Sequence, residues 1–302
     1  MCSTPMRTLA YDTSKVAPQP VRSPLQWWLR RMGRSRLTVA GLVVVLGIVI
    51  AALLAPIIAP YDPVALDIEA LLVPPGRAHP LGTDELGRDI LSRIVFGARY
   101  ALLIGVAVVL IEAVIGIVLG SCAAYFGGWL DVVLMRIVDI MLAVPTLVLA
   151  LAIAGVLGGG LGNMILAIGV TGWREFARLM RGQVLVIRTS TYVEAARALG
   201  GRDLRILVRH ILPNALGTII VFTTLEMPTA LLWAASLSFL GLGAQPPTPE
   251  WGAMVAEGRG FIGQAWWVST FPGLAIMTTV LGFNFLGDGL RDMLDPRTAR
   301  MA

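Results

Sequence analysis

The stretch TYVEAARALG, residues 191–200, is a polar, arginine-containing island between two long apolar stretches. Thr191 and Glu194 have the spacing of a capping box, in which each side chain binds a free backbone N–H of the other residue. This spacing predicts a helix that starts at Tyr192. The helix is expected to end at Gly200, because glycine readily adopts the left-handed conformation that closes a helix. At roughly 12 Å it is too short to span a bilayer, so it lies across a partner or simply connects two spans.

The segment that follows the island, residues 201–214, reads GRDLRILVRHILPN. Asp203 is a favoured residue type for a helix N-cap, so we expect it to cap a second short helix. That helix is predicted to end near Pro213, since proline has no backbone N–H with which to continue a helix.

The rest of the chain has the composition of a polytopic, all-α membrane protein. Of its 302 residues, 56% are hydrophobic and 14% are charged, against about 25% charged in a typical soluble domain. A membrane-spanning helix needs roughly 20 mainly apolar residues. Windows of this kind lie at 37–60, 101–128, 140–173, 211–249 and 260–287. Glycines at 158–162 divide the third window into two spans joined by a tight turn, which predicts six spans in total.

Basic residues indicate the orientation of these spans, because Lys and Arg concentrate on the cytoplasmic side. Seven lie in residues 1–36, eight in 174–209 and three in 291–300. The N-terminal tail 1–36, a loop at 182–216 and the C-terminal tail 291–302 are therefore predicted to be cytoplasmic. The segments 61–97 and 243–268 are predicted to lie outside, with the first span at 37–60 and a core of five helices at 98–290. The net charge of +5 then reflects topology and needs no nucleic-acid partner.

Smaller features fit the same topology. The pattern Gly116-xxx-Gly120 predicts a small-residue face for close helix contact in the second span. Trp266 and Trp267 fit an aromatic belt at the outer interface. Cys2 is in the tail and Cys122 in a span, so no structural disulfide is expected.

Several enzymatic functions are excluded by motifs that the sequence lacks. The only lysine, Lys15, lies in no G-x-x-x-x-G-K-[ST] loop, so this chain is not a P-loop ATPase. No paired-histidine metal motif and no G-x-S-x-G elbow occur. The acidic residues near His79 (Asp84, Glu85 and Asp89) could supply metal ligands, although turn and helix-cap roles explain them more simply.

Two carboxyl groups, Glu112 and Glu226, lie inside predicted spans, where ionisable side chains are costly and are often functional. Either could line a translocation path, or each could bond to a neighbouring helix or to an arginine such as Arg99 or Arg136. An ion-coupled secondary transporter could use both as relay groups. Such transporters are commonly built from internal inverted repeats, and the sequence shows none. A membrane-embedded enzyme lacks an assembled nucleophile or metal set.

The island also carries a family signature. The segment resembles the EAA loop of binding-protein-dependent ABC importer permeases. The matching residues are Glu194-Ala195-Ala196, then Gly200, then HILP at 210–213. Three further stretches make the resemblance more specific. They are LGTDELGRD at 81–89, SLSFLGLG at 236–243 and GDGLRD at 287–292, the last followed by LDP at 294–296. They are similar to the C-type permease subunits of dipeptide, oligopeptide, glutathione or nickel importers.

This resemblance implies a type I ABC importer permease fold, a bacterial cytoplasmic (inner) membrane location and a non-catalytic role. The expected partners are a homologous B-type permease, two ABC ATPase subunits, an extracytoplasmic solute-binding protein near the outer loop 243–268, membrane lipid and a peptide-like solute. No cofactor is expected in this chain, because ATP and Mg²⁺ would bind the ATPases. The residues expected to couple to the ATPases are Tyr192, Glu194, Ala195, Ala196, Arg197, Leu199, Gly200 and Arg202.

Overall fold

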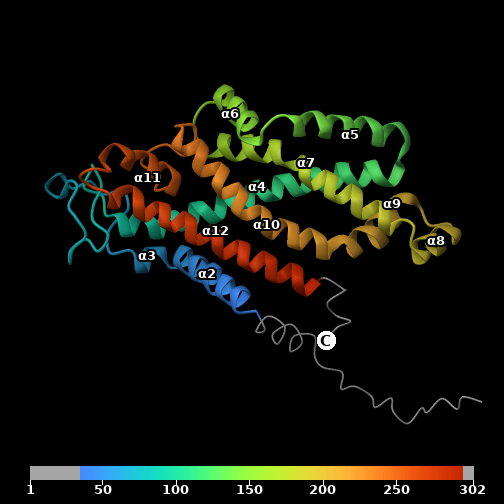
Figure 1. Cartoon of the computed structure of the whole chain (residues 1–302), viewed down its shortest axis with the longest axis horizontal. Helices are drawn as coiled ribbons and strands as arrows, with labels where there is room; N and C mark the ends of the chain where they lie inside the picture. Colours follow the sequence, from blue (N-terminus) through green and yellow to red (C-terminus); the bar gives the residue numbers. More distant parts are fainter. Residues whose placement is uncertain (1–34, 295–302) are drawn as a thin grey trace, which may run out of the picture.

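The computed structural model describes residues 35–294, and within this range the regular elements are helices (Figure 1). The predicted tails 1–36 and 291–302 therefore fall mainly outside the described residues. The helices are α2 (Arg36–Leu53), α3 (Ala55–Ile58), α4 (Ile90–Phe126), α5 (Gly128–Ala143), α6 (Thr146–Leu157), α7 (Leu161–Ile187), α8 (Thr191–Ala198), α9 (Asp203–Ile206), α10 (Leu212–Phe239), α11 (Trp251–Gly258) and α12 (Trp267–Leu294). A π-helical turn, Leu207–Ile211, joins α9 to α10, and short 3₁₀ turns lie at Ile68–Ala70 and Arg259–Phe261.

Four stretches of helix among the described residues are long and apolar enough to cross a membrane: α2, α4, the continuous run Asp203–Phe239 and α12. The bent pair of α5 and α6 adds a fifth candidate. Helix α7 has 27 residues, about 40 Å at 1.5 Å per residue, which is enough for the hydrocarbon core. Its second half carries arginines, which lowers its hydropathy. The described residues thus hold four or five spans by length and composition, and α7 is long enough to be a sixth without passing on composition.

The third predicted span is not one straight helix. It is divided into α5 and α6, which are bent by 91° at a short break. Pro145 lies in this break, and the residue before it, Val144, has extended backbone angles (φ −96°, ψ 129°). A proline disfavours helical angles at the preceding residue, and this accounts for the break.

The glycine-rich turn predicted at 158–163 is confirmed. Gly158 and Gly160 have φ values of 84° and 140°, which end α6 and allow α7 to start. Asn163 reaches back from α7 and donates to the carbonyls of Leu157 (2.9 Å) and Gly158 (3.1 Å). These bonds satisfy carbonyls that the end of α6 leaves free.

The centre of the bundle is the contact between α4 and α7, and it uses the predicted small-residue face. A Cβ atom added at Gly120 would lie 2.2 Å from the carbonyl oxygen of Ala177, and one added at Gly116 would lie 2.3 Å from Cβ of Phe176. The two backbones therefore approach more closely than any larger residue would allow.

We expect Gly120→Ala to destabilise the protein, because its new methyl group meets a helix backbone that cannot move aside. The expected loss is about 1–3 kcal/mol, the usual range for overpacking. Gly155→Ala in α6 is the matched control, since a Cβ atom there would meet nothing within 4 Å. Thermal unfolding in detergent measures both variants. Equal melting temperatures would contradict this account of the α4–α7 contact.

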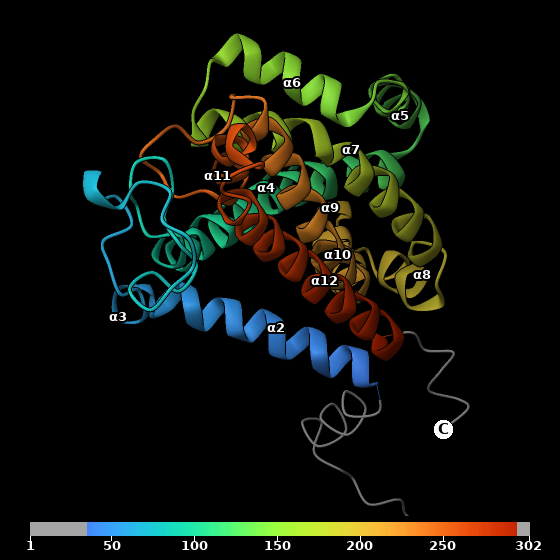
Figure 2. The ribbon, with the colours of Figure 1, turned by 60° about the vertical axis from the view of Figure 1, so that its left-hand side comes forward.

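The helices place different segments at the two ends of the molecule (Figures 1 and 2). Helix α8, the start of α2 and the end of α12 lie toward one end, here called the α8 end. The long connection between α3 and α4 and helix α11 lie at the opposite end, here called the α11 end. The start of α2, the end of α12 and the island thus lie toward the same end of the molecule, and the side of the membrane on which this end lies stays a prediction.

Candidate coupling surface and membrane path

Helix α8 begins one residue earlier than predicted, and the capping box does not form. Ser190 occupies the N-cap without a side-chain cap bond. Its backbone carbonyl accepts the N–H groups of Val193 (3.0 Å) and Glu194 (3.1 Å). Ser190 Oγ instead donates to the Ile187 carbonyl at 2.6 Å, which holds the chain to the end of α7. Because Ser190 is the last non-helical residue, Thr191 lies inside the helix and cannot cap it.

The predicted end of α8 is confirmed. Gly200 has a φ of 80°. Its N–H donates to the Arg197 carbonyl at 3.0 Å, and the N–H of Gly201 donates to the Ala196 carbonyl at 3.1 Å. These two bonds form a Schellman motif, which requires the left-handed conformation at Gly200.

Helix α8 is anchored on one side and exposed on the other. Val193 is fully buried, in a cluster with Ala124, Tyr125, Met180, Val184, Ile206, Leu207, Ile211 and Ala215. Ala196 is half-buried against this cluster. The other predicted coupling residues are exposed, including Leu199, which is 89% exposed. An apolar side chain exposed to this degree, on a rigidly held helix, fits an interaction surface.

Two further residues extend this surface and were not predicted. Leu204 is 68% exposed and Val208 is 54% exposed. Their spacing of four residues on a helical stretch was the available signal, because such residues share a helix face. We call the exposed residues of this region the coupling surface: Tyr192, Glu194, Ala195, Arg197, Leu199, Gly200, Arg202, Leu204 and Val208.

The predicted second helix is wrong in both its cap and its end. Asp203 is the first residue of α9, and Arg202 occupies the N-cap. Oδ1 of Asp203 accepts a hydrogen bond from the Tyr125 hydroxyl at 2.7 Å. The helix does not stop near Pro213, since the π-helical turn leads directly into α10 and places Pro213 in its first turn. A proline is tolerated there because a backbone N–H is not needed at that position.

Glu112 and Glu226 are brought together by the packing of α4, α7 and α10. Glu112 is 5% exposed and lies against α7, where a Cβ atom on Gly172 would come 1.8 Å from its Oε1. It interacts electrostatically with Glu226, Glu175 and Arg174. Carboxyl groups from α4, α7 and α10 therefore lie near enough to one another to interact electrostatically.

The arginines suggested as partners of Glu112 lie elsewhere. Arg99 donates to the carbonyls of Ala52 (2.6 Å) and Leu53 (3.3 Å) at the end of α2. Arg136 is exposed on α5. Arg174 on α7 is buried, but it donates to the Met141 carbonyl at 2.7 Å and so covers the end of α5.

The motif at 81–89 builds a buried charge cluster at the α11 end. Arg88 and Arg93 are almost fully buried. Asp84 accepts from Arg88 Nε at 2.7 Å and also from Arg93. Glu257 on α11 accepts from Arg88 Nη2 (3.0 Å) and Arg93 Nη1 (3.1 Å). This cluster, Asp84–Arg88–Arg93–Glu257, ties the connection before α4 to α11.

Two further polar residues of this region, Asp89 and His79, have partners within the chain. Asp89 is the N-cap of α4, and its Oδ2 accepts the N–H of Ser92 at 2.8 Å. His79 Nδ1 lies 2.9 Å from Asp89 Oδ1. Residues 35–294 hold no group of three or more His, Cys, Asp or Glu side chains that could bind a metal ion. Asp89 thus has the helix-cap role that was expected for this group.

Two acidic side chains at this end have perturbed pKa values. Burial raises the pKa of Glu85 above its usual value, and the neighbouring charges of Asp84 and Glu257 raise it further. Burial also raises the pKa of Glu250, although its carboxylate accepts the N–H groups of Gly252 and Ala253 as the N-cap of α11. Desolvation is the main cause in both cases.

The prediction of an aromatic belt is wrong for one of its two tryptophans. Trp267 is 6% exposed, and its Nε1–H donates to the Thr83 carbonyl at 3.1 Å. It packs against Gly82, where an added Cβ atom would lie 2.7 Å from the indole ring. Trp266, at 51% exposed, keeps the exposure that a belt residue needs.

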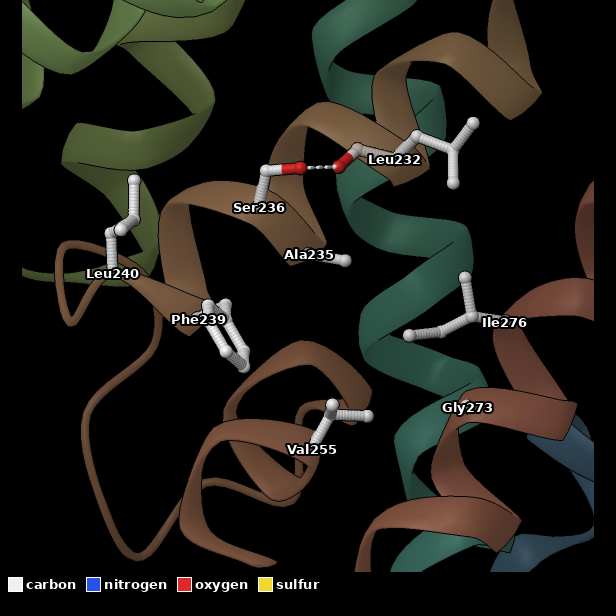
Figure 3. Close-up of a pocket in the computed structure, with 8 residues that line it drawn as sticks. All are labelled: Leu232, Ala235, Ser236, Phe239, Leu240, Val255, Gly273 and Ile276. Carbon is white, nitrogen blue, oxygen red and sulfur yellow. Dashed lines mark hydrogen bonds between the residues drawn. The ribbon is translucent and has the colours of Figure 1, made fainter. Parts of the chain in front are cut away.

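An apolar groove of about 430 Å³ lies between α10, α11 and α12 (Figure 3). Phe239, Val255 and Ile276 contribute large apolar side chains to its walls. The hydroxyl of Ser236 donates to the Leu232 carbonyl of its own helix at 2.7 Å. The groove therefore offers few polar groups to a peptide, and it is separate from the carboxyl groups of Glu112 and Glu226.

Comparison with known proteins identifies the class. Residues 116–300 match the model of the family described as binding-protein-dependent transport system inner membrane component, and residues 23–75 match the N-terminal TM domain of oligopeptide transport permease C. The chain belongs to this family and is a membrane permease of an ABC importer. The alternative of an ion-coupled secondary transporter is not favoured.

Two relatives from Escherichia coli are similar along nearly their whole length. One is "Probable D,D-dipeptide transport system permease protein DdpC", 44% identical over 293 residues, which are 96% of this chain and 97% of that protein. The other is "Glutathione transport system permease protein GsiD", 47% identical over 283 residues, which are 93% of each chain.

A solved structure supports the fold. It is the MetNI methionine ABC transporter in an inward-facing conformation, with a TM-score of 0.57 and 22% identity. The match covers 68% of this chain and 98% of the matched chain. The helical architecture is thus that of a type I ABC importer permease.

Proposed function

We propose that this chain, together with a homologous B-type permease, forms the membrane pathway of an importer for di- or oligopeptides or a related solute such as glutathione. Two separate ABC ATPase subunits would supply the energy and hold the ATP and Mg²⁺. The chain itself would be non-catalytic, in the bacterial inner membrane with both termini in the cytoplasm. The solute classes named for the two Escherichia coli relatives support the choice of a peptide.

The observation that carries the proposal is the construction of α8. The buried side chain of Val193 anchors α8 to the apolar cluster, and the Schellman motif at Gly200 ends the helix. Leu199 is exposed at this end. A short helix that is rigidly held and exposes apolar and charged groups can transmit the displacement of a bound partner. The coupling surface is therefore the expected docking site for an ATPase subunit. The solute-binding protein is expected to dock at the α11 end, near residues 243–268.

The test of the solute uses the binding protein that delivers it. We expect a D,D-dipeptide, an ordinary dipeptide or glutathione to raise the melting temperature of the solute-binding protein encoded with this chain. Stabilisation by Ni²⁺ alone would contradict the peptide assignment. The same solute should then be taken up by proteoliposomes that contain the assembled importer.

Glu226 is the stronger candidate for a contact with the solute. It is half-buried on α10, whereas Glu112 is almost fully enclosed. A carboxylate in the pathway could bind the ammonium group of a peptide, since opposite charges attract strongly where water is scarce.

We expect Glu226→Gln to lower solute uptake roughly tenfold, the effect of losing one charged hydrogen bond. Assembly with the ATPases should not change. Glu69→Gln removes an exposed carboxylate at the α11 end and serves as the control. Initial uptake rates and subunit co-purification measure the two effects. Loss of assembly in Glu226→Gln would instead indicate a structural role.

A further inference from the structure

Tyr125 connects the end of α4 to the coupling loop. It is the penultimate residue of α4 and is 8% exposed. Its hydroxyl donates to Oδ1 of Asp203 at 2.7 Å. A hydrogen bond to a carboxylate is stronger than one between neutral groups. The bond links α4 to α9, which follows α8 directly.

A second contact brings α8 itself to the same tyrosine. The guanidinium carbon of Arg197, in the last turn of α8, lies 5.9 Å from the centre of the Tyr125 ring. This distance is within the range of a cation–π interaction. One aromatic side chain of α4 thus contacts both short helices of the coupling loop.

Ala124, the residue before Tyr125, is bonded to the end of α7. Arg188, at the end of α7, donates from Nη1 to the Ala124 carbonyl at 2.6 Å. Polar contacts therefore fix the end of α4 to α7, α8 and α9. The same end also belongs to the apolar cluster that contains Val193. Of these contacts, those of Tyr125 reach the coupling loop directly.

Helix α4 extends from this point to the other end of the molecule. It runs without a break from Ile90 to Phe126. Near its start, Arg93 contacts Glu257 on α11 at 3.1 Å. One unbroken helix thus joins the Tyr125 end to the contact with α11.

We propose that Tyr125 is the positioning residue through which movement of α8 is passed to α4 and on to the α11 end, with Asp203 and Arg197 as its two contacts. This inference rests on the proposed function of α8 as the docking helix for an ATPase. It adds the route by which docking at the α8 end changes the opposite end. Neither Tyr125 nor Asp203 belongs to the predicted set of coupling residues.

The experiment uses the assembled importer in lipid nanodiscs, with ATP and orthovanadate to trap the closed ATPases. Hydrogen–deuterium exchange is followed at α8 and at α11, so that no solute is needed. The test variant is Tyr125→Phe, which removes the hydroxyl and keeps the ring. Tyr100→Phe, in the same helix but away from α8, is the matched control. Co-purification of the ATPases verifies assembly.

In the wild-type importer, ATP and vanadate are expected to change exchange at both helices. In Tyr125→Phe the change at α8 should remain, while the change at α11 should be reduced, because the charge-assisted bond to Asp203 is lost. Asp203→Asn keeps an acceptor oxygen but removes its charge, so it should have a smaller effect in the same direction. The double variant should be no worse than Tyr125→Phe alone, because the two residues share one interaction. Tyr100→Phe should behave as the wild type.

Two results overturn the inference in different ways. If α11 responds in Tyr125→Phe and in Asp203→Asn as it does in the wild type, α8 still couples to the ATPase but not through Tyr125. If α8 does not respond in the wild type, the docking role of α8 is wrong and the inference fails with it. Should Tyr125→Phe not assemble, Asp203→Asn, which leaves the tyrosine in place, gives the same comparison.

Discussion

Replacing Gly200 with valine is expected to abolish ATP-driven uptake while leaving membrane insertion intact. Gly200 has a φ of 80°, and a Cβ atom there would meet no other atom within 4 Å. The effect of the substitution is therefore conformational and not a steric clash. A β-branched residue in the left-handed region is strained by about 1–3 kcal/mol. We expect the chain to relieve this strain by opening the Schellman motif. Leu199 and Arg202 would then leave the positions that they hold on the coupling surface.

The matched control is Gly182→Val. A Cβ atom at Gly182 also meets nothing within 4 Å, but the residue lies inside α7 with ordinary helical angles. Uptake by proteoliposomes and co-purification of the ATPases measure the effect. Gly182→Val should retain both within a small factor. Normal uptake in Gly200→Val would show that the shape of this turn is not needed for coupling.

Replacing Asp84 with asparagine is expected to produce the largest loss of stability. Asp84 accepts from two arginines, Arg88 and Arg93, whose side chains are 2% and 1% exposed. Once this charge is removed, Glu257 is the remaining close acidic partner of the two arginines. Oε1 of Glu85 lies farther away, at 3.6 Å from Arg88 Nη2. Removing one partner of a buried ion pair typically costs about 3–5 kcal/mol, and here two buried guanidinium groups are left to share the carboxylate of Glu257.

Glu69→Gln is the control for this loss of charge, since Glu69 is exposed in the same segment. Thermal unfolding of the purified protein should show a much lower melting temperature for Asp84→Asn than for Glu69→Gln. Proteolysis of the connection between α3 and α4 should also increase in Asp84→Asn alone. Equal melting temperatures would mean that the Asp84–Arg88–Arg93–Glu257 cluster does not hold this region together.

The features predicted correctly from the sequence depend on local chemistry. Long apolar windows become helices because backbone groups in a bilayer must be satisfied within the chain. Gly200 closes α8 because glycine accepts a positive φ. The face of Gly116 and Gly120 packs against α7 because small residues permit close approach.

The features that were missed depend on contacts between distant segments. Trp267 is buried at a site where its indole N–H donates to the carbonyl of Thr83, 184 positions earlier. Asp203 is used by Tyr125, which lies 78 positions earlier in the chain. Two missed features had a local signal. Proline restricts the residue before it, which indicates the bend at Pro145, and the spacing of Leu204 and Val208 places them on one helix face.

The same distinction applies to the predicted site. Exposure of Leu199 and of the other predicted coupling residues except Ala196 followed from their place in a short helix between spans. That Glu112 and Glu226 lie near enough to one another to interact electrostatically could not be derived from their positions, because it depends on how α4 and α10 are turned against α7. Their roles in transport, like the docking role of α8, remain predictions.

The most direct test of the account is solute uptake by proteoliposomes containing the two permeases, with and without the ATPase subunits. The solute is supplied on its binding protein. We predict uptake that requires the ATPases together with ATP and Mg²⁺, and that is lost in Gly200→Val. Uptake by the permeases alone, driven by a pH gradient, would contradict the proposal that ATP hydrolysis on separate subunits drives transport.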